Sequence, residues 1–417
     1  MEEIRMRRIT QVFEEKKIEN IPVEISREFE RIRLSGRIKP GMQVGITVGS
    51  RGINNLLLIL KCAIEEVRKR GGVPFILTAM GSHGGATAEG QKKVLKNYGI
   101  TEETMGVPIK SSMDVVELGR LENGLPVHFD KAAFEADGIV VVNRIKVHTA
   151  FKSGIESGLC KMLSVGLGNH EGASLVHYLG VKGLRDYMVD FARVILEKAP
   201  VLCGLGILEN AYDETYRLTA AAPKDFEGVD MELLQECKRI MPSLPVSDID
   251  ILIVEEIGKN ISGTGMDTNI VGGIREYREG EYDPPKIKKI ILLDLTKDAE
   301  GNALGIGLAD LITRKLYDKI DFGATYENTI TTTFLERAKI PIICKSEEEA
   351  FHTALKTSWN LPGTKPRVMI IRNTLKLDDL YISEPIWEEI RSRADIRPSG
   401  DWEKLNFDAH GNLMLRV

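Results

Sequence analysis

The chain has 417 residues, of which 43% are hydrophobic and 28% are charged, with a net charge of −5 and a pI near 6.0. The length exceeds what one compact core usually holds, so we expect two domains, at 1–242 and 243–417. The slightly acidic balance argues against binding nucleic acid or a membrane surface through charge alone. The sequence contains no run of eighteen apolar residues and no secretory signal, and its five scattered cysteines form no CxxC pair. These features predict a cytoplasmic location.

In the first half of the chain, apolar strand-like runs alternate with glycine-bearing loops and helical segments. After a charged lead-in with helical segments over 1–38, the pattern predicts strands at 43–48, 73–80 and 138–142 and helices at 53–70 and 88–99. This alternation indicates an α/β domain with a mostly parallel sheet. Ligands in such sheets bind where strands end and loops begin.

The second half begins after a proline- and aspartate-bearing linker, MPSLPVSDID, at 241–250. A further α/β series follows, with strands expected at 251–255, 289–295 and 367–372, a helix at 303–319 and an exposed loop at 275–286. We therefore predict two α/β domains with mostly parallel sheets and an active-site cleft between them. The N-terminal domain would bind the cofactor and carry out catalysis, and the C-terminal domain would close the cleft.

The loops after the first two strands carry candidate site residues. Ser50 and Arg51, in Gly-Ser-Arg-Gly before a helix, could bind a phosphate or carboxylate, or they could form a simple tight turn. The loop is neither a Walker A motif nor GxGxxG, which disfavours nucleotide triphosphates and NAD. His83 lies among glycines at a strand end and could transfer protons near neutral pH, or it could be a capping or surface histidine.

The block that follows the third strand is rich in basic residues and glycine. In NRIKVHT, alternation in an extended segment would place Arg144, Lys146 and His148 on one face, either at a site or along an exposed basic edge. Lys161 lies among small and apolar residues, which would lower its pKa if it is buried; the alternative is a lysine that reaches the surface from a helix. His170 and His177 are seven residues apart on an expected helix and by themselves read as structural histidines.

The combination of these loops resembles the nickel-dependent lactate racemase family. The resemblance rests on GSRGI at 49–53, MGSHGGAT at 80–87, NRIKVHT at 143–149 and ESGLCKM at 156–162. It covers the first half of the chain well and the second half only as a general α/β domain. The motifs look like an uncharacterised branch of that superfamily rather than the lactate enzyme itself.

The resemblance implies a nickel pincer nucleotide, a pyridinium mononucleotide that holds nickel and is attached to a lysine. Lys161 would be that lysine, and His177, sixteen residues further on, would bind the metal rather than His170. His83 and His148 would be the two acid/base histidines. The resemblance places Arg51 near the substrate- or cofactor-binding arginine, and Ser50 and Lys146 beside it are assigned to the same cofactor-binding group.

The implied activity is racemisation or epimerisation of a small 2-hydroxy acid or sugar acid. Hydride would pass to the pyridinium ring while a histidine takes the hydroxyl proton. The resemblance also implies cofactor biosynthesis proteins as partners, and a homo-oligomer is possible. Two departures stand out: Gly158-Leu159-Cys160 replaces the family's Gly-Gly-Arg, and Glu156 is an added acid.

Two other functions fit the same residues. One is a metal- or phosphate-dependent enzyme that uses His83, His148 and His177 without the organic cofactor. The other is a non-catalytic ligand- or cofactor-binding protein of the same fold.

Overall fold

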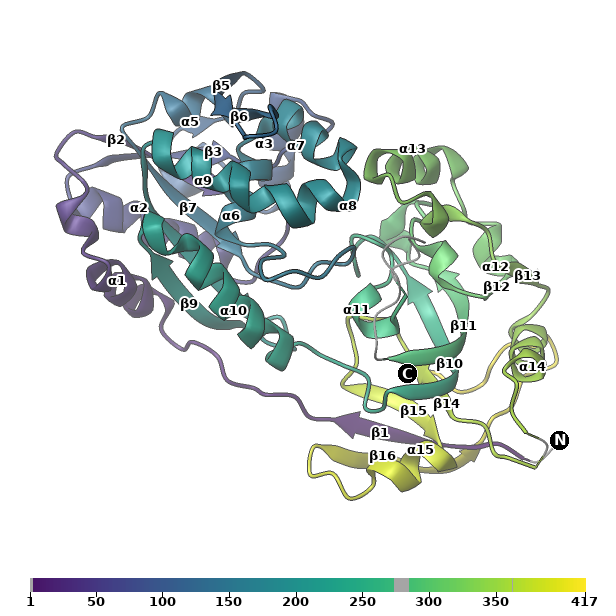
Figure 1. Ribbon diagram of the computed structural model, residues 1–417. Coiled ribbons are helices and arrows are strands. Elements are labelled where there is room, and N and C mark those ends of the chain that lie inside the picture. Colours follow the sequence, from purple (N-terminus) through teal and green to yellow (C-terminus); the bar gives the residue numbers. More distant parts are fainter. Residues whose placement is uncertain (1–2, 274–284, 362) are drawn as a thin grey trace. The chain divides into compact units, whose positions relative to one another are not determined.

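The computed structural model describes residues 3–273, 285–361 and 363–417 (Figure 1). It divides into two compact units, Glu14–Met241 and Met1–Phe13 together with Pro242–Val417. The second unit begins at the expected linker, but it also includes the N-terminal strand. This corrects the expected 1–242 domain, because strand β1 (Arg5–Gln11) hydrogen bonds within the sheet of the second unit.

The Glu14–Met241 unit is built on a six-stranded sheet in the order β4-β3-β2-β7-β8-β9. All neighbouring strands are parallel except the final pair, in which β9 runs antiparallel to β8. A separate antiparallel pair, β5 with β6, completes the strands of this unit. The strands are β2 (Gln43–Val48), β3 (Val73–Thr78), β4 (Ile109–Lys110), β5 (Val115–Arg120), β6 (Pro126–Asp130), β7 (Gly138–Arg144), β8 (Val201–Glu209) and β9 (Thr215–Ala221).

Helices cover both faces of this sheet, and β8 shows how its residues divide between them. Leu205 and Ile207 point into the core formed with α1 and α2. Gly204 and Gly206, on the opposite face, leave room for the side chains of α6 and α10. The helical segments are α1 (Ile21–Arg31), η1 (Leu34–Gly36), α2 (Leu56–Lys69), α3 (Ala88–Asn97), α4 (Glu102–Met105), α5 (Lys131–Phe134), α6 (Leu159–Lys161), η2 (Met162–Gly166), α7 (Asn169–Tyr178), α8 (Gly180–Lys182), η3 (Gly183–Tyr187), α9 (Met188–Lys198), η4 (Pro223–Asp225) and α10 (Phe226–Ile240).

The other unit contains an eight-stranded mixed sheet in the order β13-β12-β11-β10-β14-β15-β1-β16. The first five strands are parallel, and β15, β1 and β16 add antiparallel pairs. Helix α14 packs its buried Ala350, Phe351 and Ala354 into the core of this sheet. The remaining elements are β10 (Asp248–Ile257), α11 (Thr268–Val271), β11 (Lys286–Leu295), η5 (Lys297–Ala299), η6 (Ile306–Leu308), β12 (Leu311–Thr313), α12 (Arg314–Tyr317), α13 (Phe322–Thr332), η7 (Leu335–Ala338), β13 (Ile342–Cys344), α14 (Glu347–Thr357), β14 (Val368–Ile371), β15 (Asp379–Ser383), α15 (Glu384–Ile390) and β16 (Ile396–Lys404).

The expected α/β class with mostly parallel sheets is confirmed, and two local predictions are wrong. The lead-in begins with strand β1, whose alternating charged residues do not read as a buried strand. The helix expected at 303–319 is instead η6, β12 and α12, because the Leu311–Thr313 run is buried as a parallel strand between β11 and β13. Most of the loop expected at 275–286 lies outside the described residues.

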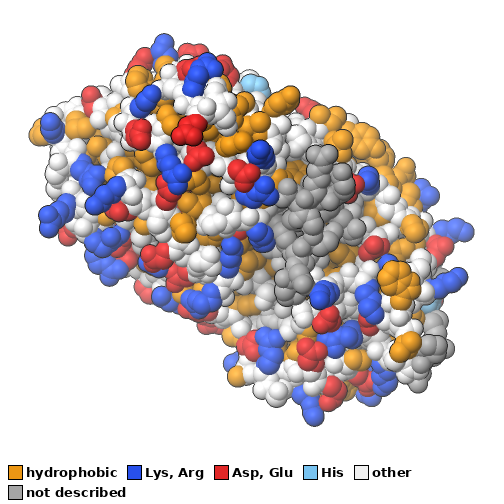
Figure 2. All heavy atoms as spheres, viewed as in Figure 1, with side chains coloured by type: hydrophobic (Ala, Val, Ile, Leu, Met, Phe, Trp, Pro, Cys, Tyr) orange, Lys and Arg blue, Asp and Glu red, His pale blue; other side chains and the backbone are white. Residues whose placement is uncertain are grey.

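The face seen in Figure 2 gives little sign of a charge-driven partner. Figure 2 shows acidic and basic side chains intermixed over the face in view, as the near-neutral composition predicts. None of the described helices has the length and apolar composition needed to cross a membrane.

Candidate functional site

The strand order of the Glu14–Met241 unit contains a topological switch point between β2 and β7. From β2 the chain continues outward to β3 and β4, whereas β7 continues to β8 on the other side. Loops that leave neighbouring strands in opposite directions open a crevice at the carboxyl ends of the strands, where α/β proteins bind ligands. All the candidate residues before α6 follow such ends: Ser50 and Arg51 after β2, His83 after β3, and Lys146 and His148 after β7.

The loops after β2 and β3 meet through a side-chain contact. The Ser50 hydroxyl is hydrogen bonded to Nδ1 of His83. The Tyr98 hydroxyl donates to the Ser50 carbonyl at 3.0 Å, so the β2 loop is also tied to the end of α3. The structure therefore brings together two residues that the sequence placed in separate motifs.

The loop after β3 packs its backbone directly against η2, the π-helical turn that follows Lys161. The Gly81 N–H donates to the Gly166 carbonyl at 3.0 Å, and a Cβ at Gly81 would lie 2.9 Å from the Val165 carbonyl oxygen. The absence of a side chain at Gly81 thus permits this close approach.

An acidic residue at the end of β8 was missed in the sequence. Glu209 is almost fully buried and forms an ion pair with Arg144 at the end of β7. Its other oxygen accepts the N–H of Asn54, just before α2, at 2.6 Å. Glu209 therefore joins β7 and β8 to the start of α2. The available signal was an acid that ends an apolar strand-like run, VLCGLGILE at 201–209.

The segment after β7 keeps the predicted alternation beyond the last strand residue. Ile145 and Val147 are buried in a local core, whereas Lys146 is exposed and His148 is partly exposed. Nδ1 of His148 accepts the N–H of Ala150 at 3.1 Å, and its ring lies 4.5 Å, centroid to centroid, from that of Phe151. These contacts restrain the imidazole relative to its own backbone.

Lys161 ends the short helix α6 and is followed at once by η2. Burial, then the positive charge of Arg51 and then that of Lys146, lowers the pKa of Lys161 from 10.5 to about 8. Desolvation by the surrounding protein also lowers the pKa of Arg51, with a smaller contribution from the charge of Arg144, while part of the Arg51 side chain stays exposed. A lysine in this setting has a substantial neutral, nucleophilic fraction near neutral pH. Irregular π-helical turns are frequent at functional sites.

Helix α7 presents its two histidines to different surroundings. Burial, followed by the charge of Lys161, lowers the pKa of His177 from 6.5 to about 4, so the ring is neutral at pH 7. His170 is exposed, and its Nδ1 lies 3.4 Å from the Ser174 hydroxyl. Of the two, His177 is the one whose environment includes Lys161.

Three further polar residues have contacts of their own. His128 and His352 are close to Glu171 and Glu348, at 3.6 and 3.8 Å. In the other unit, Asp267 accepts the N–H of Asn269 at 2.9 Å and caps the start of α11.

No three His, Cys, Asp or Glu side chains are grouped as metal ligands in the part of the chain that the structure describes.

Comparison with known proteins gives one family match and related structures. Residues 6–181 match the family model of the lactate racemase N-terminal domain, a range that includes every candidate from Ser50 to His177. The lactate racemase apoprotein from Thermoanaerobacterium thermosaccharolyticum is similar in structure, with a TM-score of 0.54 and 15% identity, covering 86% of this chain and 93% of that chain. A structural-genomics protein from Thermotoga maritima gives a TM-score of 0.45 and 16% identity, covering 66% and 72%. No curated protein matches the sequence.

Proposed function

We propose that this chain, whose residues 6–181 match the lactate racemase N-terminal domain, is a racemase or epimerase of a small 2-hydroxy acid or sugar acid that uses a nickel pincer nucleotide. The observation that carries the proposal is the environment of Lys161. Its amine has a pKa of about 8, close to the cationic Arg51 and to the neutral imidazole of His177. A tether, an anion-binding charge and a metal-binding nitrogen are the three features that this cofactor requires.

The residues of this group fit the cofactor in their chemistry. Lys161 would hold it covalently, and His177 would supply a neutral nitrogen to nickel, since only the unprotonated ring binds metal. Ser50, Arg51 and Lys146 would bind its phosphate or the carboxylate of the substrate. When bound, the cofactor supplies a hydride acceptor at its pyridinium ring.

His83 and His148 are proposed to exchange the hydroxyl proton of the substrate. The Ser50 hydroxyl contacts Nδ1 of His83, so we assign proton exchange on that ring to Nε2. Nδ1 of His148 accepts the Ala150 N–H, so its neutral ring carries the proton on Nε2 and would present an N–H to the substrate; for His148 to take a proton at Nε2, the Ala150 contact would have to be released. The contact with Ser50 would orient His83, and the fold of the 148–151 turn would orient His148. Two histidines in these roles would allow either enantiomer to be the starting material.

The test is expression of the chain together with the cofactor biosynthesis proteins. We expect an intact-mass increase that peptide mapping assigns to Lys161, stoichiometric nickel, and interconversion of one pair in a panel of chiral hydroxy acids. Lys161→Ala should abolish the mass increase and lower turnover to the uncatalysed rate, whereas His83→Ala and His148→Ala should keep the adduct and lose about 10²–10⁴-fold in rate.

The outcomes also distinguish the two alternative functions. Turnover without any adduct on Lys161 would favour a metal- or phosphate-dependent enzyme. An adduct with nickel but no turnover on any hydroxy acid or sugar acid would favour a cofactor-binding protein.

A further inference from the structure

Helix α10 directs two ionisable side chains at the segment that carries His148 and Lys161. Asp230 and Lys238 are eight residues apart, just over two helical turns and about 12 Å along the axis, so they lie on the same side of the helix. Leu234, midway between them, is buried on this side. The helix therefore spans the distance between two anchor points.

Asp230 caps the helical segment that contains Lys161. The carboxylate is fully buried, and its two oxygens accept the N–H groups of Leu159 and Cys160, both at 2.8 Å. The first N–H groups of a helix lack partners within the helix and are usually capped by a side chain just before it. Here that position is Gly158, and the cap comes from α10 instead.

Gly158 is adapted to this arrangement in two ways. Its φ of 102° is unfavourable for residues with a side chain, and a Cβ here would lie 2.2 Å from Oδ1 of Asp230. The Gly158 carbonyl also accepts the Asn143 side-chain amide at 2.7 Å. The turn before Lys161 is thus held between β7 and α10.

Lys238 supports the other end of the segment through Glu156. Its ammonium lies 2.9 Å from the carboxylate of Glu156, which is fully buried. That carboxylate accepts the N–H of His148 at 2.8 Å and the N–H of Ser153 at 3.2 Å. The acid that departs from the family pattern therefore closes the 148–153 turn and links it to α10.

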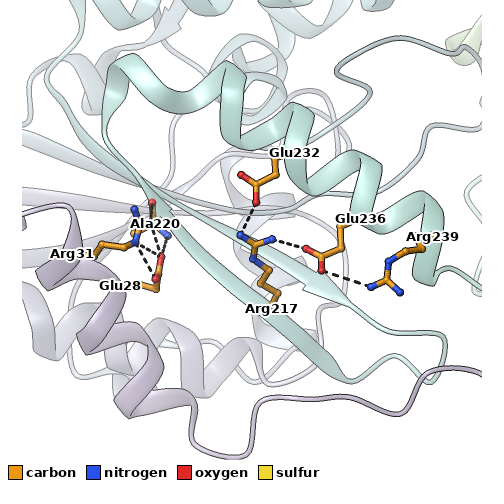
Figure 3. Close-up of polar contacts among 7 residues, drawn as sticks. All are labelled: Glu28, Arg31, Arg217, Ala220, Glu232, Glu236 and Arg239. Atoms are coloured by element: carbon orange, nitrogen blue, oxygen red, sulfur yellow. Dashed lines mark hydrogen bonds and ion pairs between the residues drawn. The ribbon is translucent and has the colours of Figure 1, made fainter.

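A different side of α10 is fastened to the sheet. Arg217 of β9 forms ion pairs with Glu232 and Glu236 at 2.7 and 2.6 Å, and Arg239 lies 3.8 Å from Glu236 (Figure 3). On the α1 side of β9, the Ala220 N–H donates to the Glu28 carboxylate at 2.8 Å, and the Ala220 carbonyl accepts a hydrogen bond from the Arg31 guanidinium. The sheet thus supports α10, and α10 supports the site segment.

We propose that α10 is the positioning element of this site, with Asp230 fixing the backbone before Lys161 and Lys238, through Glu156, fixing the backbone of His148. The contacts stand independently of the reaction; only the roles of Lys161 and His148 rest on the proposed function.

The experiment compares three single substitutions in the full chain without cofactor. Asp230→Asn keeps the side-chain shape but replaces one acceptor by an NH₂ group, and Lys238→Met removes the cation that pairs with Glu156. Glu232→Gln, on the same helix, is the matched control, because it removes only an exposed ion pair and leaves the pair between Arg217 and Glu236 in place. Hydrogen exchange is measured on peptides over 146–155 and 156–166, and acetylation of Lys161 is measured against pH.

We expect each variant to affect its own end of the segment. Asp230→Asn should speed exchange at 156–166 at least tenfold. It should also move half-maximal acetylation of Lys161 to higher pH than in the wild type by admitting water, because burial is the main cause that lowers the pKa of Lys161. Lys238→Met should speed exchange at 146–155 at least tenfold, with a smaller effect on Lys161. Glu232→Gln should resemble wild type in every measurement.

The proposal would be overturned if the hydrogen-exchange rates of Asp230→Asn and Lys238→Met were the same as those of Glu232→Gln. If Asp230→Asn does not fold, Lys238→Met alone decides, because the Lys238 side chain is about one-third exposed and Glu156 keeps its two amide partners. Failure of the proposed function is seen separately. In that case cofactor-loaded wild type would not racemise any substrate, although the exchange pattern would still hold.

Discussion

The loops after β2 and β3 and the segment after β7 reach the same edge of one sheet, but they are held there differently. The β3 loop depends on close backbone packing at glycines. A Cβ at Gly84, whose φ is 68°, would lie 2.7 Å from the Gln91 nitrogen, and one at Gly90 would lie 1.8 Å from the Gly84 carbonyl oxygen. Gln91 adds a hydrogen bond to the Gly81 carbonyl at 3.0 Å.

The segment after β7 depends instead on buried charges. Glu156 and Asp230 each satisfy two backbone N–H groups, and Lys238 neutralises the first of these acids. The loop after β3 should therefore be sensitive to substitutions that add atoms at its glycines. The segment after β7 should be sensitive to substitutions or pH changes that remove a charge. Each prediction below changes one half of the site and leaves the other intact.

The largest effect is expected at Gly90. Glycine to alanine within a helix normally gains about 1 kcal/mol, but in Gly90→Ala the new methyl group would meet the Gly84 carbonyl. We expect a loss of about 3 kcal/mol, or roughly 10 °C in the melting temperature of a unit of this size, measured by thermal unfolding.

Gly228→Ala is the matched control for this substitution. Gly228 lies in α10, and no atom is within 4 Å of the position that its Cβ would take. The same chemical change should therefore be neutral or slightly stabilising there. Equal melting temperatures for the two variants would show that the β3 loop does not depend on glycine packing.

A smaller, pH-dependent effect is expected at Asp230. Burial raises the pKa of this carboxyl from 3.8 to about 7, against the two N–H bonds, which lower it. Between about pH 4 and pH 7, the folded protein therefore keeps a proton on Asp230 that the unfolded chain has released. The stability that this proton contributes is lost as the pH rises through this range. Asp230→Asn has no such titrating group. The free energy of unfolding of the wild type, relative to that of Asp230→Asn, should therefore fall by about 1.4 kcal/mol per pH unit near pH 5.5.

Denaturant unfolding at intervals from pH 5 to pH 8 measures this difference. A difference between wild type and Asp230→Asn that is constant over the whole range would mean that the carboxyl is not desolvated as described. The segment after β7 would then depend on packing rather than on a buried charge, as the loop after β3 does.

Much of the site follows from local sequence patterns, because the strands after which its residues lie have clear signals. The alternation of buried Ile145 and Val147 with Lys146 and His148 could be read directly from the sequence. The apolar surroundings of Lys161 indicated a lowered pKa, and the structure gives the same direction.

The supporting residues could not be predicted in this way, because their partners are distant in the chain. Asp230 caps N–H groups about 70 residues earlier and looks like an ordinary helix residue in sequence. Strand β1 joins partners near 380 and 400, and its basic residues hide its pairing. The run at 303–319 is ambiguous between helix and strand until neighbouring strands bury it.

The smallest effect is expected at His177, and it tests whether the charge-dependent half extends into α7. In the wild type, the ring should titrate near pH 4 by histidine NMR, since burial and the charge of Lys161 both oppose protonation. In Lys161→Met, the midpoint should rise but stay below 6.5, because burial is the larger cause and remains. His170 in the same spectrum serves as the internal reference, since it lies on the same helix but is exposed. A midpoint that is unchanged by Lys161→Met would separate His177 from the lysine and remove the electrostatic reason for preferring it to His170 as the metal ligand.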